Sequence, residues 1–130
     1  MPKFKEFNRK TVFRSKDPRA TIQKGGTMSL NAAAAQLVTS SGDDIPAEFS
    51  AVFLYDEDEQ IVAMRLDAKS MNKYEFRKQT GSQTWVVSSQ SFMKYHKVDT
   101  SGARNYALHE YGDNIFGFSL NDPFRDVGRS

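Results

Sequence analysis

Basic residues are concentrated at the amino terminus of this 130-residue chain, whose formal net charge is +2. Residues 1–19 carry seven basic side chains against two acidic ones, and the basic ones are Lys3, Lys5, Arg9, Lys10, Arg14, Lys16 and Arg19. An arm of this charge can neutralise phosphates and give salt-dependent affinity for nucleic acid. A solvated terminus is the alternative, but Phe4, Phe7, Val12 and Phe13 lie between the charges and favour an ordered segment.

Further basic residues occur in predicted hairpins. Lys24 stands beside Gly25, and Arg77 and Lys78 end the segment KYEFRK at residues 73–78. Alternation of charged and apolar residues predicts that this segment is a strand. We therefore expect Lys24, Arg77 and Lys78 to reach phosphates from hairpins.

Aromatic residues lie close to the second of these basic groups. If Tyr74, Phe76 or Trp85 were exposed on a sheet, each could stack an unpaired base, as single-strand binders do. However, Tyr74 and Phe76 fall on one face of the predicted strand, and aromatic residues that share a strand face usually belong to the core. We favour the core for these residues and for Trp85.

Residues that commonly perform catalysis are sparse. The chain has no cysteine, and its two histidines, His96 and His109, have no nucleophile or second metal ligand at a suitable spacing. We therefore expect both histidines to be surface residues. The acidic run at residues 56–59 lacks the alternating ligands and central glycine of a calcium loop, so we expect a solvated turn that faces away from any nucleic acid. No phosphate-binding glycine motif is present. We expect neither an enzyme nor a cofactor nor a metal site.

The apolar and polar periodicity predicts four hairpins and two short helices. Asn31 is expected to cap the first helix, Ser88 or Ser89 the second, and Gly25-Gly26 to form a two-residue primed turn. The predicted order is a hairpin at residues 20–24 and 27–30, a helix at 32–38, a hairpin at 47–55 and 61–66, a hairpin at 73–78 and 83–88, a helix at 90–98, and a hairpin at 104–111 and 115–120.

The predicted order of hairpin, helix and hairpin therefore occurs twice along the chain. Leu54, Ile61 and Leu66 are separated by seven and five residues, and Leu108, Ile115 and Leu120 repeat these spacings 54 residues later. We predict an internal duplication. The expected fold is mainly β, of the α+β kind, with two units that interleave into one closed antiparallel sheet or barrel because open strand edges invite pairing.

The expected domain organisation follows from these boundaries. A basic arm at residues 1–19 precedes a single globular domain at 20–122, whose similar halves are 20–67 and 73–122. Residues 123–130 form a predicted tail.

The first half resembles the AbrB-like, swapped-hairpin domains of bacterial transition-state regulators and antitoxins. The segments that carry the resemblance are ATIQK, Gly25-Gly26, TMSLN, AAAAQLV, Gly42-Asp43, FSAVFLYD and QIVAMRL. In such regulators an intertwined dimer presents basic hairpin residues to DNA. The resemblance implies a tandem version of that fold, in which Lys24, Arg77 and Lys78 would be the equivalent DNA contacts.

These observations lead to one leading hypothesis and two alternatives. The absence of cysteine and of an apolar run of membrane-spanning length favours a cytoplasmic protein with no membrane partner. The leading hypothesis is a non-enzymatic DNA-binding, transcription-regulatory protein. A single-stranded nucleic-acid binder of the Whirly type is one alternative, and a protein-interaction or assembly module is the other. Assembly into a homo-oligomer is left open.

Overall fold

The computed structural model describes residues 17–41 and 44–123. Two helices are present in this part of the chain, α2 (Ala32–Thr39) and α3 (Gln90–Tyr95). The strands are β1 (Arg19–Ile22), β2 (Met28–Asn31), β3 (Glu48–Asp56), β4 (Ile61–Leu66), β5 (Tyr74–Lys78), β6 (Thr84–Val87), β7 (Arg104–Ala107), β8 (His109–Gly112) and β9 (Ile115–Ser119). The predicted mainly β fold class is confirmed.

The strands form one antiparallel sheet that nearly closes on itself. Its order is β7-β1-β2-β6-β5-β3-β4-β9-β8. The two outermost strands, β7 and β8, follow each other in the chain and are separated only by Leu108. β7 pairs with β1, and β8 pairs with β9. Tyr106 also bridges to Pro123. The ends of the sheet are therefore joined by the chain itself, which removes most of the open edge.

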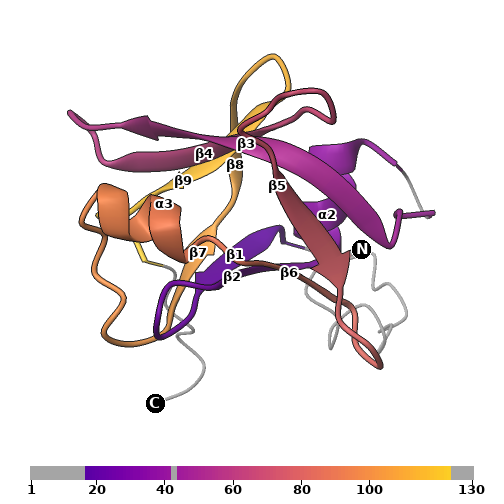
Figure 1. Ribbon diagram of the computed structural model, residues 1–130, viewed down its shortest axis with the longest axis horizontal. Coiled ribbons are helices and arrows are strands. Elements are labelled where there is room, and N and C mark those ends of the chain that lie inside the picture. Colours follow the sequence, from indigo (N-terminus) through magenta and orange to yellow (C-terminus); the bar gives the residue numbers. More distant parts are fainter. Residues whose placement is uncertain (1–16, 42–43, 124–130) are drawn as a thin grey trace, which may run out of the picture.

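Two layers of the sheet enclose the core (Figure 1). One layer contains β3, β4, β8 and β9, the other contains β1, β2, β6 and β7, and β5 runs from one to the other. Helix α2 lies at one end of the molecule and α3 at the opposite end. The helices thus cover the ends of the layered sheet rather than one face.

Small side chains bring α2 close to the sheet. Ala34 and Ala35 are fully buried, and the helix packs on β1, β2, β4 and β6. The Asn31 side chain caps the helix as predicted, since its Oδ1 accepts a hydrogen bond of 2.9 Å from the Ala34 N–H. The alanines are therefore structural residues of the core.

The predicted core aromatics are buried. Phe76 is fully buried and stacks on Phe49 with a centroid separation of 4.8 Å. Trp85 is 1% exposed, and its indole N–H donates to the Pro46 carbonyl at 2.8 Å, which satisfies its buried polar atom. Tyr74 is half-buried and packs edge-on against Phe53. The prediction of a core position is therefore confirmed for Phe76 and Trp85, whereas Tyr74 is half-buried at the edge of the core.

The two halves of the chain repeat one pattern of strand pairing. Consider an exchange of β1 with β5, β2 with β6, β3 with the β7–β8 run, and β4 with β9. Every observed pairing then becomes an observed pairing. The β1–β7 pair becomes β5–β3, whereas β2–β6 and β4–β9 map onto themselves. Strands of one half thus pair with strands of the other at four places. A common origin of the halves by duplication stays a prediction.

Some local predictions were wrong. The first turn is closed by the Gly26 N–H donating to the Gln23 carbonyl at 2.9 Å, so its central residues are Lys24 and Gly25. Only Gly25 of these two has a positive φ, of 95°, whereas a primed turn of type I′ needs both. The fourth hairpin was predicted with one strand at residues 104–111, but that segment divides at Leu108 because its two parts pair with different neighbours.

The second helix and the arm also differ from expectation. Helix α3 ends at Tyr95 instead of Val98, and Ser89 occupies the N-cap position without a capping hydrogen bond. Its hydroxyl donates instead to the Gly26 carbonyl, which gives this buried polar group a hydrogen-bond partner. Arg19, expected in the arm, is the first residue of β1 and pairs with Ala107. The other basic residues of the predicted arm lie outside the described residues, as do residues 124–130.

Candidate nucleic-acid interface

The turn that carries Lys24 is fixed against α3 and the loop that follows it. The Gly25 N–H donates to the Thr100 carbonyl at 3.0 Å, and the buried Ser89 hydroxyl donates to the Gly26 carbonyl at 2.7 Å. A Cβ on Gly26 would lie 3.1 Å from the Gln90 Cα, so backbone packs directly on backbone here. These contacts join residues more than 60 positions apart and hold Lys24 at the same end of the molecule as α3.

Helix α3 ends abruptly and leaves basic residues at its carboxyl end. The Lys97 N–H donates to the Lys94 carbonyl at 3.1 Å and the Val98 N–H donates to the Met93 carbonyl at 2.9 Å. Lys97 itself has a φ of 58°, which is the left-handed residue of a Schellman-type helix end. Lys94 and Lys97 are both exposed, as is Lys24.

An aromatic stack supports the same end of α3. His96 lies 4.3 Å from Tyr55 and 4.7 Å from Phe92, measured between ring centroids. The exposed ring of Tyr95 meets His96 at 4.9 Å and 90°. His96 was predicted to be a surface residue, and the structure instead places it half-buried in this stack.

Arg104 adds a further cation, with an acidic partner. Its Nη2 lies 3.2 Å from Asp99 Oδ2, and both side chains are about half exposed. The backbone N–H and the hydroxyl of Ser101 donate to Asp99 and, with Arg104, lower the pKa of that carboxyl below its ordinary value of 3.8. Asp99 therefore stays ionised and offsets part of the positive charge of Arg104.

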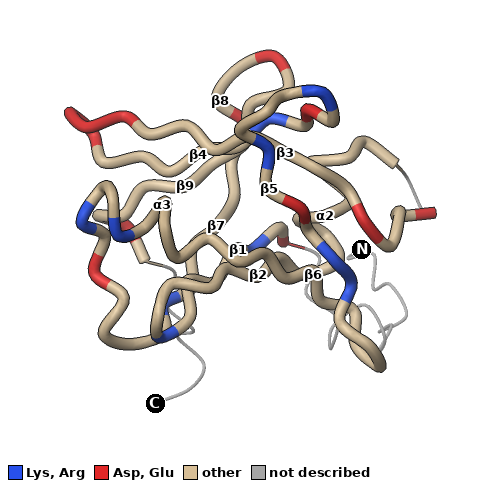
Figure 2. The backbone as a smooth tube through the Cα atoms, in the orientation of Figure 1, with Lys and Arg blue, Asp and Glu red and all other residues tan. Residues whose placement is uncertain are grey.

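We call this region the α3 end and define it by Lys24, Lys94, Tyr95, Lys97 and Arg104. Figure 2 shows basic segments on α3 and on the lower strands at this end of the molecule, and an acidic turn beyond them at the tip of β3 and β4. That turn, residues 56–59, is exposed and follows Tyr55 directly. The solvated turn is confirmed, and it borders the α3 end on one side.

The other predicted hairpin contacts lie elsewhere. Lys78 Nζ is 5.8 Å from the centroid of Trp85, and the Lys78 N–H donates to the Ala47 carbonyl, so the β5–β6 hairpin packs on the segment after α2. The β1–β2 turn packs beside α3, at the opposite end (Figure 1). The structure therefore separates Lys24 from Arg77 and Lys78, and these three residues do not form one surface.

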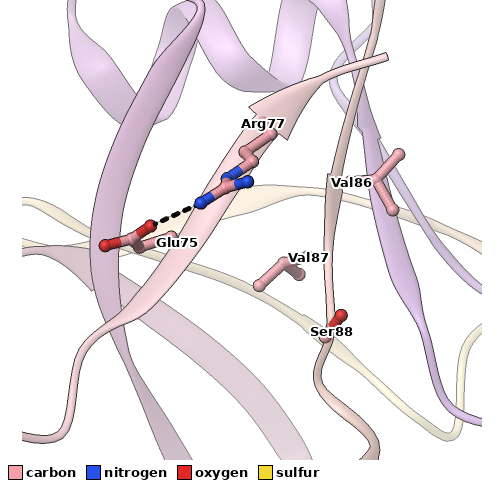
Figure 3. A pocket seen from close by; sticks show the side chains of 5 residues that line it. All are labelled: Glu75, Arg77, Val86, Val87 and Ser88. Carbon is pink, nitrogen blue, oxygen red and sulfur yellow. Dashed lines mark hydrogen bonds and ion pairs between the residues drawn. The ribbon is translucent and has the colours of Figure 1, made fainter.

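A shallow hollow lies over β5 and β6 (Figure 3). It has a volume of about 430 Å³ and is lined by Glu75, Arg77, Val86, Val87 and Ser88. Arg77 Nη2 lies 3.3 Å from Glu75 Oε1, and both side chains are more than half exposed. Because the carboxylate balances the guanidinium, the hollow has little preference for an anion. Arg77 therefore has an exposed acidic partner, as Arg104 does.

Metal and membrane sites were also sought. No group of three or more histidine, cysteine, aspartate or glutamate residues in the described ranges, 17–41 and 44–123, could hold a metal ion. None of the helices in these ranges is long and apolar enough to cross a membrane.

Sequence reasoning missed Lys94, Tyr95, Lys97 and Arg104 as members of a site. A signal was present, because the segment KYHK at residues 94–97 combines basic and aromatic residues in four positions. The sequence did not indicate which other segment lies beside it, because no local pattern predicts that the β1–β2 turn packs on α3.

Comparisons with known proteins give no further assignment. No family model matches the chain, and neither a curated protein nor a solved structure is significantly similar to it.

Proposed function

We propose that this protein is a non-enzymatic DNA-binding regulatory protein, which contacts phosphates through its basic amino-terminal arm and the α3 end. The observation that carries the proposal is the docking of the Lys24 turn onto α3, which brings Lys24 to the same end of the molecule as Lys94 and Lys97. Arg104 lies at this end too, because it pairs with Ile22 just before the turn. Arm and body would then act together, with the arm adding six lysines and arginines that precede Arg19.

Charge alone supports affinity and not sequence preference. Each phosphate that a lysine or arginine neutralises releases a counterion, so the affinity falls steeply with salt. The acidic turn at residues 56–59 would repel phosphates, so it limits the side from which DNA approaches the α3 end. Arg77 lies at the other end of the molecule, so it does not belong to this contact.

A pair of charge-matched double variants tests the interface. Lys24→Gln with Lys94→Gln should make the plot of log affinity against log salt concentration less steep by roughly 2, since each phosphate contact contributes roughly 0.9 to that slope. Arg77→Gln with Lys78→Gln removes the same charge and should change the slope little. The measurement is fluorescence anisotropy of a labelled DNA duplex at several salt concentrations.

Deleting the arm gives an independent check. Removal of residues 1–16 leaves Arg19 in β1 and should reduce both affinity and salt slope, with the thermal transition of the folded body retained. Absence of any binding at low salt would refute the proposal. An equal loss in the two double variants would show that binding follows net charge and not the α3 end.

One observation favours the assembly module as a second candidate. All four residues of β8 are exposed, and in the described part of the chain this strand pairs only with β9. An exposed strand edge can pair with another chain. Light scattering on the purified protein separates the candidates, because a defined oligomer that binds no DNA at low salt would favour assembly.

A further inference from the structure

We propose that the α3 end binds unpaired nucleotides, with the ring of Tyr95 stacking on a base and Lys94 and Lys97 contacting the flanking phosphates. This inference rests on the proposed function and narrows its ligand to single-stranded or locally opened nucleic acid. The stacking residue proposed here is Tyr95, because Phe76 and Trp85, which were considered for stacking from the sequence, are buried.

Tyr95 has the exposure that a stacking platform needs. Its side chain is 81% exposed, whereas Tyr74 and Tyr55 are half-buried and packed on phenylalanines. A base that covers this ring removes apolar area from water on both partners, and such stacking tolerates any base because every base has a π-face. The neighbouring histidine contacts the ring at 90°, so the exposed area is not consumed by that contact.

The backbone that carries Tyr95 is anchored by its chain neighbours. His96, which packs against Tyr95, is itself packed on Tyr55 from β3 and on Phe92 from the buried side of α3. The left-handed backbone at Lys97 and the hydrogen bond from Val98 to Met93 fix where the helix ends. An anchored backbone reduces the conformational entropy that is lost when a base stacks on the ring, which favours affinity.

Exposed lysines flank Tyr95 in the sequence and can contact phosphates next to a stacked base. Lys94 precedes the ring in sequence and Lys97 follows it, and both are exposed. Opposing charges are close: Asp99 is paired with Arg104, and the acidic turn at residues 56–59 begins directly after Tyr55. A duplex carries two phosphate backbones and conceals its bases, so it meets more of the acidic turn and gains nothing from Tyr95. The arrangement therefore favours unpaired nucleotides at this place.

The experiment uses the full chain and two labelled ligands, a single-stranded oligonucleotide and its duplex. Tyr95→Ala should weaken binding of the single strand by about 5-fold to 150-fold, the range that stacking of one base gives. Tyr95→Phe keeps the ring and should bind as the parent does. Met71→Ala, which truncates a side chain that is 98% exposed in the β4–β5 loop, is the matched control for loss of exposed apolar area and should have no effect.

The outcomes separate this inference from the proposed function. If Tyr95→Ala binds the single strand as tightly as the parent, or if Tyr95→Phe is as defective as Tyr95→Ala, the stacking role is wrong even though the salt-dependent DNA binding stands. If Tyr95→Ala weakens the duplex as much as the single strand, the preference for unpaired bases is wrong. Absence of binding to both ligands at low salt refutes the proposed function itself. A retained thermal transition in each variant shows that the fold is intact.

Discussion

Four residues other than glycine have a positive φ in the described ranges, and they fall into two corresponding pairs. Ser40 directly follows the last residue of α2, and Lys97 lies two residues after the end of α3. Gln60 and Asn114 end the turns before β4 and β9. Gln60 and Asn114 are 54 residues apart, which is the offset of the leucine and isoleucine spacing. Side chains with a Cβ adopt this conformation at a cost, and asparagine does so more readily than glutamine.

Gln60 offers a stability test at the scale of single residues. Gln60→Gly should stabilise the protein by about 1 kcal/mol, because glycine has no Cβ to strain the left-handed backbone. Asn114→Gly is the matched control, and its gain should be smaller because asparagine tolerates this region. Chemical denaturation of both variants measures the free energy of unfolding. A loss of stability in Gln60→Gly would contradict this account of the turn.

Close contact between β4 and β9 is a constraint at the scale of elements. Gly117 pairs with Ala63, and a Cβ on Gly117 would lie 2.8 Å from the Ala63 Cα and in conflict with the Val62 carbonyl. Both neighbours belong to β4, so relief would require the backbone of one strand to move. Since β4–β9 is one of the pairings that join the halves of the chain, this contact supports the closure of the sheet.

Gly117→Ala should therefore destabilise the protein by about 1–3 kcal/mol, the usual cost of overpacking a well-filled region. Gly112→Ala provides the control, because a Cβ at that position meets nothing within 4 Å. The denaturation midpoints of the two variants give the comparison. Equal stability of Gly117→Ala and the parent would mean that β4 and β9 adjust more easily than their packing indicates.

At the scale of the whole molecule, neither half has a complete set of partners of its own. β1 pairs with β7, β2 with β6, β3 with β5 and β4 with β9, so four pairings cross between the halves. The core cluster likewise draws on both halves, since Leu30, Val62, Phe76 and Phe118 are all fully buried in it. Cutting the chain between them exposes both the strand edges and the core.

We expect a fragment of residues 1–70 to lack the monomeric fold, and co-expression with residues 71–130 to restore a stable one-to-one complex. Size-exclusion chromatography with light scattering and circular dichroism measure assembly and strand content. The uncut chain is the control. A fragment that folds alone as a stable monomer would contradict the interdependence of the halves.

The local features of this protein were predictable because they depend on neighbouring residues. Alternation predicted the strands, the alanine run with Asn31 predicted α2, and shared strand faces predicted that Phe76 would be buried. Two of the predictions that failed were decided by a distant partner. Ser89 gives its hydroxyl to Gly26, 63 residues away, and the 104–111 strand divides because β1 and β9 each take one part.

The sequence by itself determined the kinds of elements, their order and most of the buried aromatics, since hydrophobic periodicity and turn residues are local properties. The charge of the arm is also a property of the sequence alone. Only the tertiary structure decided that Lys24 lies with Lys94 and Lys97, and that Arg77 is balanced by Glu75 at the other end. These juxtapositions come from strand pairing and from hydrogen bonds between distant segments, which no spacing along the chain records.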